Sequence, residues 1–167
     1  MSISVVSVKV LNNPCKFMDP FTFEICVSCQ AELEDDLEWK LVYVGSADSE
    51  KYDQILENVF VGPLNIGINQ FTFQAPAPNP DKIPTKDILG ATVIMLSCSY
   101  MGHEYTRIGY YVNNEYTTEE LRENPPQVPN VDFIQRNILD ENPRITLYSL
   151  DSEKKSEPVE NDMNVEK

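Results

Sequence analysis

Segments in which apolar and polar residues alternate recur along the whole chain. In residues 21–27 and 37–44 the odd positions are aromatic or aliphatic, whereas most of their neighbours are polar. Successive side chains of a β-strand point to opposite faces, so these patterns predict strands with one face in a hydrophobic core. The same pattern predicts strands within residues 3–11, 59–61, 70–75, 91–100, 105–116 and 144–150.

Turn-forming residues separate these segments. The turn signals are Asn12-Asn13-Pro14, Asp19-Pro20, Gly62-Pro63 and the proline-rich run 76–84. Short strands joined by turns rather than by long helices favour two packed antiparallel sheets. We therefore predict an all-β fold, an immunoglobulin-like antiparallel β-sandwich.

Helical patterns are confined to two short segments late in the chain. Thr117 begins a capping-box pattern in which Glu120 reaches back toward the start of the helix, and Pro125 blocks its extension. A second helix is expected to begin near Asp132. Its apolar face would contain Phe133, Ile134, Ile138 and Leu139.

Length and composition indicate one domain and a tail. The chain has 167 residues, enough for one compact domain that buries about 70% of the surface of its unfolded chain. We place this domain at residues 1–150. Residues 151–167 contain no aromatic residue and carry six acidic and three basic residues, so we expect a disordered acidic tail there.

The charge balance narrows the classes of partner. There are 27 acidic and 13 basic residues, a net charge of -14, which disfavours direct binding to nucleic acid and favours basic proteins. The chain shows neither a basic leader nor an apolar run of about 20 residues. We expect a soluble intracellular protein that does not bind membranes.

Neither a metal site nor a catalytic site is indicated. Cys26 and Cys29 form a C-x-x-C pattern, but an odd offset on a strand sends their side chains to opposite faces. His103 is the only histidine, and no nucleophile motif or glycine-rich phosphate loop occurs. We expect structural thiols, no cofactor and no enzymatic activity.

One strand has two unlike faces. Within residues 105–116, Ile108, Tyr110 and Val112 share the parity of a core face, which leaves Tyr105, Arg107 and Tyr111 on the outside. Arginine and tyrosine are common at binding hot spots. The alternative is that these long side chains only cover a sheet face.

Two valines have the same outward parity in other predicted strands. If Val44 and Val93 neighbour Arg107 and Tyr111, they form an exposed apolar patch that contains an arginine. Carboxylates in adjoining loops would then surround the patch and favour a basic, amphipathic helix. These carboxylates belong to Asp48, Glu50, Asp53 and Asp87.

Residues 32–38 hold five carboxylates. A solvated acidic turn explains them, because the glycine and ligand spacing of an EF-hand calcium loop are missing. A calcium-dependent, C2-like membrane-binding sandwich that uses Asp35 and Asp36 remains an alternative function.

Several sequence blocks together resemble one family. The blocks are Val10-Leu11-Asn12-Asn13-Pro14, Asp36-Leu37-Glu38-Trp39-Lys40, Tyr43-Val44-Gly45-Ser46-Ala47, Tyr52-Asp53-Gln54, the run from Arg107 to Tyr116, and Leu121-Arg122-Glu123-Asn124-Pro125-Pro126. Over nearly all of residues 1–150 the chain resembles the anti-silencing-function histone chaperones. The resemblance implies an ATP-independent chaperone that binds a dimer of histones H3 and H4 and covers the surface by which H3 forms tetramers. It also implies a nuclear protein, expected to be a monomer.

The resemblance assigns three sets of site residues. The C-terminal helix of H3 would contact Val93 at the centre of the face, with Val44, Asp53, Asp87, Arg107 and Tyr111 around it. The H4 tail would add a strand near Pro143, Arg144, Ile145 and Thr146. Downstream histone chaperones, which carry short basic motifs, would bind near Asp36, Glu38, Phe60, Val61 and Phe71.

Overall fold

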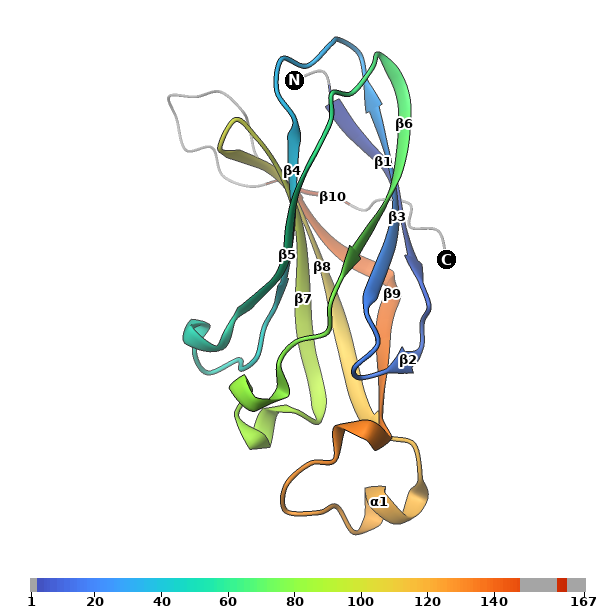
Figure 1. The fold of residues 1–167 in the computed structure, drawn as a ribbon, viewed down its shortest axis with the longest axis vertical. Coiled ribbons are helices and arrows are strands. Elements are labelled where there is room, and N and C mark those ends of the chain that lie inside the picture. Colours follow the sequence, from blue (N-terminus) through green and yellow to red (C-terminus); the bar gives the residue numbers. More distant parts are fainter. Residues whose placement is uncertain (1–2, 148–158, 162–167) are drawn as a thin grey trace.

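The fold, seen in a computed structural model that describes residues 3–147 and 159–161, consists of two antiparallel sheets packed face to face (Figure 1). The smaller sheet has three strands in the order β1-β3-β6. They are β1 (Ile3–Leu11), β3 (Phe21–Cys29) and β6 (Gly67–Ala75).

The larger sheet has seven strands. Six follow the order β10-β9-β8-β7-β4-β5, and β2 pairs separately with β9. They are β2 (Cys15–Lys16), β4 (Leu37–Tyr43), β5 (Gln54–Val61), β7 (Gly90–Tyr100), β8 (His103–Tyr116), β9 (Ile134–Leu147) and β10 (Val159–Asn161).

Helices in the described part of the chain are short and lie in loops. They are α1 (Glu119–Glu123), η1 (Glu50–Tyr52), η2 (Pro80–Lys82), η3 (Thr85–Asp87) and η4 (Val131–Phe133). None of these helices has the length and apolar character to cross a bilayer. The structure confirms the predicted immunoglobulin-like antiparallel sandwich.

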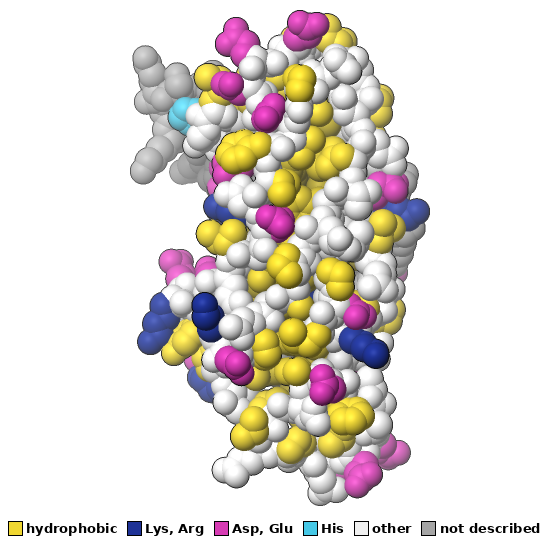
Figure 2. Space-filling view, viewed as in Figure 1, with side chains coloured by type: hydrophobic (Ala, Val, Ile, Leu, Met, Phe, Trp, Pro, Cys, Tyr) yellow, Lys and Arg dark blue, Asp and Glu magenta, His cyan; other side chains and the backbone are white. Residues whose placement is uncertain are grey.

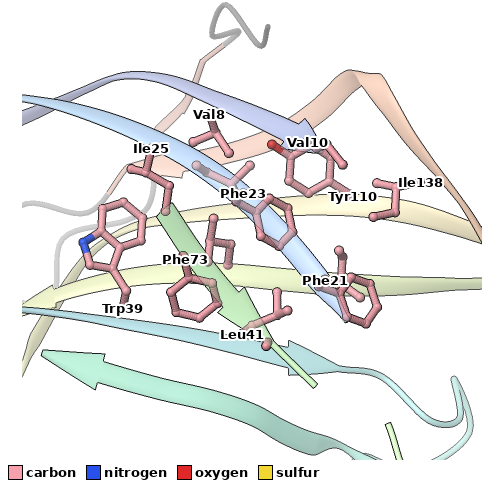
Figure 3. Close-up of a cluster of buried hydrophobic side chains, with 14 of the residues drawn as sticks. Val8, Val10, Phe21, Phe23, Ile25, Trp39, Leu41, Phe73, Tyr110 and Ile138 are labelled. Atoms are coloured by element: carbon pink, nitrogen blue, oxygen red, sulfur yellow. The ribbon is translucent and has the colours of Figure 1, made fainter. Parts of the chain in front are cut away.

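The core lies between the two sheets, where the inward parities of their strands meet. Along β3 and β4 burial alternates residue by residue. The Phe23 ring lies 6.3 Å from that of Phe73 within its own sheet and 6.1 Å from that of Tyr110 in the opposite sheet (Figure 3). Burying each side chain of this size stabilises the fold by about 1.5–3 kcal/mol, so the core fixes which strand faces point outward.

A buried arginine joins the end of the larger sheet to the turn before β3. Arg136 is 1% exposed and donates hydrogen bonds to the carbonyl oxygens of Phe17, Asp19 and Pro20 at 2.8–3.2 Å. Its guanidinium lies 3.6 Å from the centroid of the Phe21 ring. Burial lowers the pKa of Arg136, and the carbonyl oxygens compensate its charge.

The prediction of a second helix is wrong. Residues from Ile134 onward form β9, and only the 3-10 turn η4 precedes them. Ile134 and Ile138 face the core together with Arg136, whereas Leu139 is 49% exposed. Polar residues on the inward face hid the two-residue period of this strand.

The first predicted helix exists, but its cap is shifted by one residue. The N-cap is Thr118, whose hydroxyl accepts a hydrogen bond from the Leu121 backbone N–H at 3.3 Å. Thr117 instead donates its hydroxyl to the Phe133 carbonyl oxygen at 3.3 Å. The helix ends before Pro125, as predicted.

The outward position predicted for Tyr105 is also wrong. The pairing of β7 with β8 skips a residue between Cys98 and Ser99, so Cys98 faces Thr106 and Ser99 faces Glu104. This bulge places Tyr105 in the core, 6% exposed, where its hydroxyl oxygen accepts a hydrogen bond from the Cys98 thiol.

Within the predicted tail, the structure describes residues 159–161. They pair with the end of β9. The rest of the predicted tail lies outside the described residues.

Candidate functional site

The outer face of the larger sheet carries a row of apolar side chains across three neighbouring strands. Val93 on β7 is paired with Tyr111 on β8. The backbone N–H of Val44, just after β4, donates to the Val93 carbonyl oxygen at 3.0 Å. The two valines are half-buried and Tyr111 is 61% exposed. The strand order thus places side by side the residues that the parity argument selected.

A hollow lies beside this row. Its volume is about 200 Å³. It is lined by Val93, Met95, Arg107, Gly109, Tyr110, Tyr111, Arg144 and Thr146. Gly109 adds no side chain to the space between Met95 on one side and Arg144 on the other. An apolar side chain of a partner would fit into the space above Gly109.

Arg107 brings a fixed cation to the hollow. Its guanidinium makes two hydrogen bonds to the Glu104 carboxylate, at 2.8 and 3.0 Å, with side chains 42% and 28% exposed. Ion pairs this exposed contribute about 1 kcal/mol or less to stability. Arg107 can therefore bind a partner's carboxylate at little cost to the fold.

Loops next to the row supply carboxylates. Asp53 follows η1 and its backbone N–H donates to the Glu50 carbonyl oxygen at 3.0 Å. Burial, and secondarily the charge of Glu50, raise the pKa of Asp53. Asp87 ends η3, and its buried Oδ2 accepts no hydrogen bond from the described residues. Such an acceptor suits a donor from a partner.

An ion pair holds two of these loops together. The Lys86 ammonium lies 2.5 Å from the Asp48 carboxylate. This contact lowers the pKa of Asp48 and raises that of Lys86. It connects the loop after β4 with the turn before β7, the two loops that carry Asp53 and Asp87.

The face includes residues that the sequence analysis did not select. Leu139 on β9 is paired with Tyr111 and extends the apolar row to a fourth strand. Ile55 on β5 is 63% exposed and paired with Val42. Met95 has the same outward parity as Val93, so the alternation of the sequence could have indicated that Met95 belongs to this face. Leu139 gave no such signal, because its segment had been read as a helix.

A second hollow adjoins the far side of the row. It measures about 900 Å³ and is bordered by the turn at residues 11–14, by Tyr111 and by residues 137–142 of β9. Its lining is mixed, with Tyr111 and Leu139 beside asparagine and acidic side chains.

The residues predicted for the H4 tail lie at this edge. Arg144 is paired with Gly109 and Thr146 with Arg107, while Ile145 is 2% exposed. Residues 140–143 of β9 lie against the single residue Tyr110 of β8, because Leu139 is opposite Tyr111 and Arg144 is opposite Gly109. On its other side, β9 pairs with β10.

The third predicted set lies at the opposite end of the sheet order. Glu38 is paired with Phe60, which is 66% exposed, and Leu37 with Val61. Phe71 on β6 packs against Trp39, with ring centroids 5.7 Å apart. Asp36 lies close to Gly62, and a Cβ atom added to Gly62 would collide with the Asp36 carboxylate. The five predicted residues thus occur near β5 and β6, the edge strands of the two sheets.

The surface around these edge strands is apolar with acidic borders. Figure 2 views the side where β5 and β6 lie, and hydrophobic side chains appear along its length with carboxylates grouped near the top. Within residues 3–147 and 159–161, no three His, Cys, Asp or Glu side chains are placed to hold a metal ion. Side-chain chemistry here suits contact with a protein.

Taken together, the sandwich and its outer face present the residue types of a protein-binding surface, an apolar row beside an arginine and several carboxylates. Residues 1–153 match the model of the ASF1-like histone chaperones. The chain therefore belongs to this family of histone chaperones.

Curated relatives agree with the family match. The probable histone chaperone ASF1A of Arabidopsis thaliana is 54% identical over 150 residues, which cover 90% of this chain and 76% of the relative. Histone chaperone asf1b of Xenopus tropicalis is 52% identical over 163 residues, covering 95% and 82%. Histone chaperone ASF1B of Homo sapiens is 55% identical over 148 residues, covering 89% and 73%.

Family membership fixes the broad function. The chain is a histone chaperone with a role in chromatin assembly, and its partners are histones. The match favours this function over the C2-like alternative.

Proposed function

We propose that the chain is an ATP-independent chaperone of one H3/H4 dimer that acts in the nucleus as a monomer. The outer face of the larger sheet binds an amphipathic helix of H3 and covers the surface by which H3 forms tetramers. The chaperone then hands the dimer to downstream chaperones for nucleosome assembly, and takes part in disassembly. It acts by binding, without a catalytic step.

The observation that carries this proposal is the apolar row of Val44, Val93 and Tyr111 beside Arg107. A helix presents one apolar stripe flanked by charged residues. The row accepts the stripe, Arg107 pairs with a carboxylate of the helix, and Asp53 and Asp87 accept from its cations or amides. A net charge of -14 attracts the basic histone from a distance.

Two further contacts belong to the proposal. The edge of β9 at residues 143–146 takes the H4 tail as an added strand, using main-chain hydrogen bonds. The surface of Asp36, Glu38, Phe60, Val61 and Phe71 takes the basic motif of a downstream chaperone. The first contact strengthens the hold on the dimer, and the second transfers it.

Titration calorimetry of Val93→Arg with H3/H4 tests the H3 face. The half-buried position of Val93 lets the variant fold, but histone binding would bury an unpaired charge. We expect the affinity to fall by roughly 100-fold or more, about 2.7 kcal/mol.

The matched control is Ile68→Arg. Ile68 is 66% exposed on the smaller sheet, so the same charge is added away from the proposed face. Its affinity should stay within about twofold of the original chain. Equal affinities for the Val93 variant, the Ile68 variant and the original chain would refute the proposed face.

A further inference from the structure

The end of β9 is covered by the protein's own C-terminal segment. In the antiparallel pairing, Val159 lies opposite Leu147, Glu160 opposite Thr146 and Asn161 opposite Ile145. Without β10, this half of β9 would be an edge strand, because its other side is already paired with β8. An edge strand with free main-chain groups accepts an added strand from any chain of suitable register.

The covered stretch overlaps the proposed H4 contact. That contact comprises residues 143–146, and β10 pairs with residues 145–147. Two strands cannot pair with the same side of β9 at once, since each backbone N–H and carbonyl on that side forms its ladder bond with one neighbour. The two occupants therefore exclude each other at Ile145 and Thr146.

We propose that residues 159–161 are an internal competitor that occupies the β9 edge until a histone tail displaces it. Residues 159–161 pair with the edge through their main chain, but they include one acidic residue and no basic residue. A basic histone segment adds electrostatic attraction to the acidic chaperone that this segment lacks. The partner in this inference rests on the proposed function.

The arithmetic of tethering sets the size of the effect. Eleven residues separate β9 from β10, and short tethers give effective concentrations in the millimolar range. A ladder of three residue pairs is weak, so the closed state competes without locking the edge. If it is populated about threefold over the open state, it weakens the apparent affinity of a competitor about fourfold.

Asn161→Pro in the full chain removes a ladder hydrogen bond of the internal strand with a single change. Val93 bonds through its main chain to Val44, so the alternation along β7 and β8 turns the main-chain groups of Arg107 toward β9. The main-chain groups of Thr146, opposite Arg107, therefore face β8, and those of Asn161, opposite Ile145, face β9. Proline at position 161 lacks the backbone N–H that bonds to β9. Asn161→Ala is the matched control, because it removes the same side chain but keeps the backbone N–H. Both variants leave residues 3–147 and the net charge unchanged.

Two measurements on the full chain separate the strand from its function. Amide hydrogen exchange by NMR, without partner, should become about threefold faster or more for the β9 amides that face β10 in Asn161→Pro, and not in Asn161→Ala. Calorimetry with a synthetic peptide of the H4 C-terminal tail should show an affinity about threefold higher or more for Asn161→Pro alone.

Each other result overturns a defined part. Unchanged exchange in Asn161→Pro would show that the internal strand does not cover β9. Faster exchange with unchanged peptide affinity would overturn the competition. Equal effects of Asn161→Pro and Asn161→Ala would assign the change to the lost side chain rather than to pairing. A peptide that binds none of the proteins would refute the H4 contact and the competition while leaving the measured strand intact.

Discussion

Among single residues, Asp53 carries a charge state that the proposed histone contact would change. Burial and Glu50 raise the pKa of Asp53, so the free protein holds its proton to a higher pH than an ordinary aspartate does. A histone cation near this carboxylate would favour the charged form and lower the pKa. Binding then releases a proton wherever the pH lies between the lowered and the raised pKa.

This linkage predicts the pH dependence of affinity. Affinity for H3/H4 should rise with pH through the window between the two pKa values and lose this dependence above the raised pKa. Calorimetry in buffers of different ionisation enthalpy measures the released proton. In Asp53→Asn this contribution should vanish. A proton release that is the same in the variant would place Asp53 outside the contact.

Arg136 predicts a large stability effect far from any partner. Replacing it with methionine keeps much of the packing but leaves the carbonyl oxygens of Phe17, Asp19 and Pro20 without their donor. The free energy of unfolding should fall by about 3 kcal/mol, measured by urea denaturation. Arg122→Met, on the exposed helix α1, should change it by less than about 0.5 kcal/mol. Equal effects would contradict a structural role for the buried guanidinium.

At the scale of elements, sequence alternation predicted most strands because their inward parity is consistently apolar. It failed at β9, where Arg136 and Asp140 face inward and Leu139 faces outward. It failed at Tyr105 because the bulge opposite Cys98 and Ser99 shifts the parity by one residue, and bulges depend on the neighbouring strand. Local pattern therefore finds strands, whereas pairing decides which face a side chain takes.

The edge strand β5 and its neighbour β4 hold the surface proposed for downstream chaperones. Glu38→Arg should weaken binding of a peptide that carries the basic motif of a downstream chaperone by about tenfold, because it replaces an attractive charge with a repulsive one. Phe60 is paired with Glu38 and is 66% exposed, so it would supply an apolar contact to the same peptide. Fluorescence anisotropy with the labelled peptide measures the change.

The control for this edge is Glu24→Arg, on the outer face of β3. It makes the same change in net charge on the smaller sheet. Peptide affinity should be nearly unchanged in this variant, and H3/H4 affinity should be nearly unchanged in Glu38→Arg. Equal losses of peptide affinity in both variants would indicate attraction by net charge alone.

For the whole molecule, we propose separate docking surfaces at the outer face and at the edges of the sandwich. Sequence parity placed Val44, Val93 and Tyr111 on the outer face but misplaced Tyr105, and strand order was needed to show that the first three lie together. The pairing of β10 with β9 could not be predicted, because three residues carry too little pattern to indicate a strand. In the proposed function, charge acts over the whole molecule, whereas the apolar row and the edges would select where a histone docks.

The most direct test of the central claim is photo-crosslinking from the outer face. A benzoylphenylalanine in place of Tyr111, which is 61% exposed, should crosslink to histone H3 in a mixture with H3/H4. The same group in place of Ile68, on the smaller sheet, should give no H3 crosslink. Crosslinks to H3 from position 68 and none from position 111 would contradict the account.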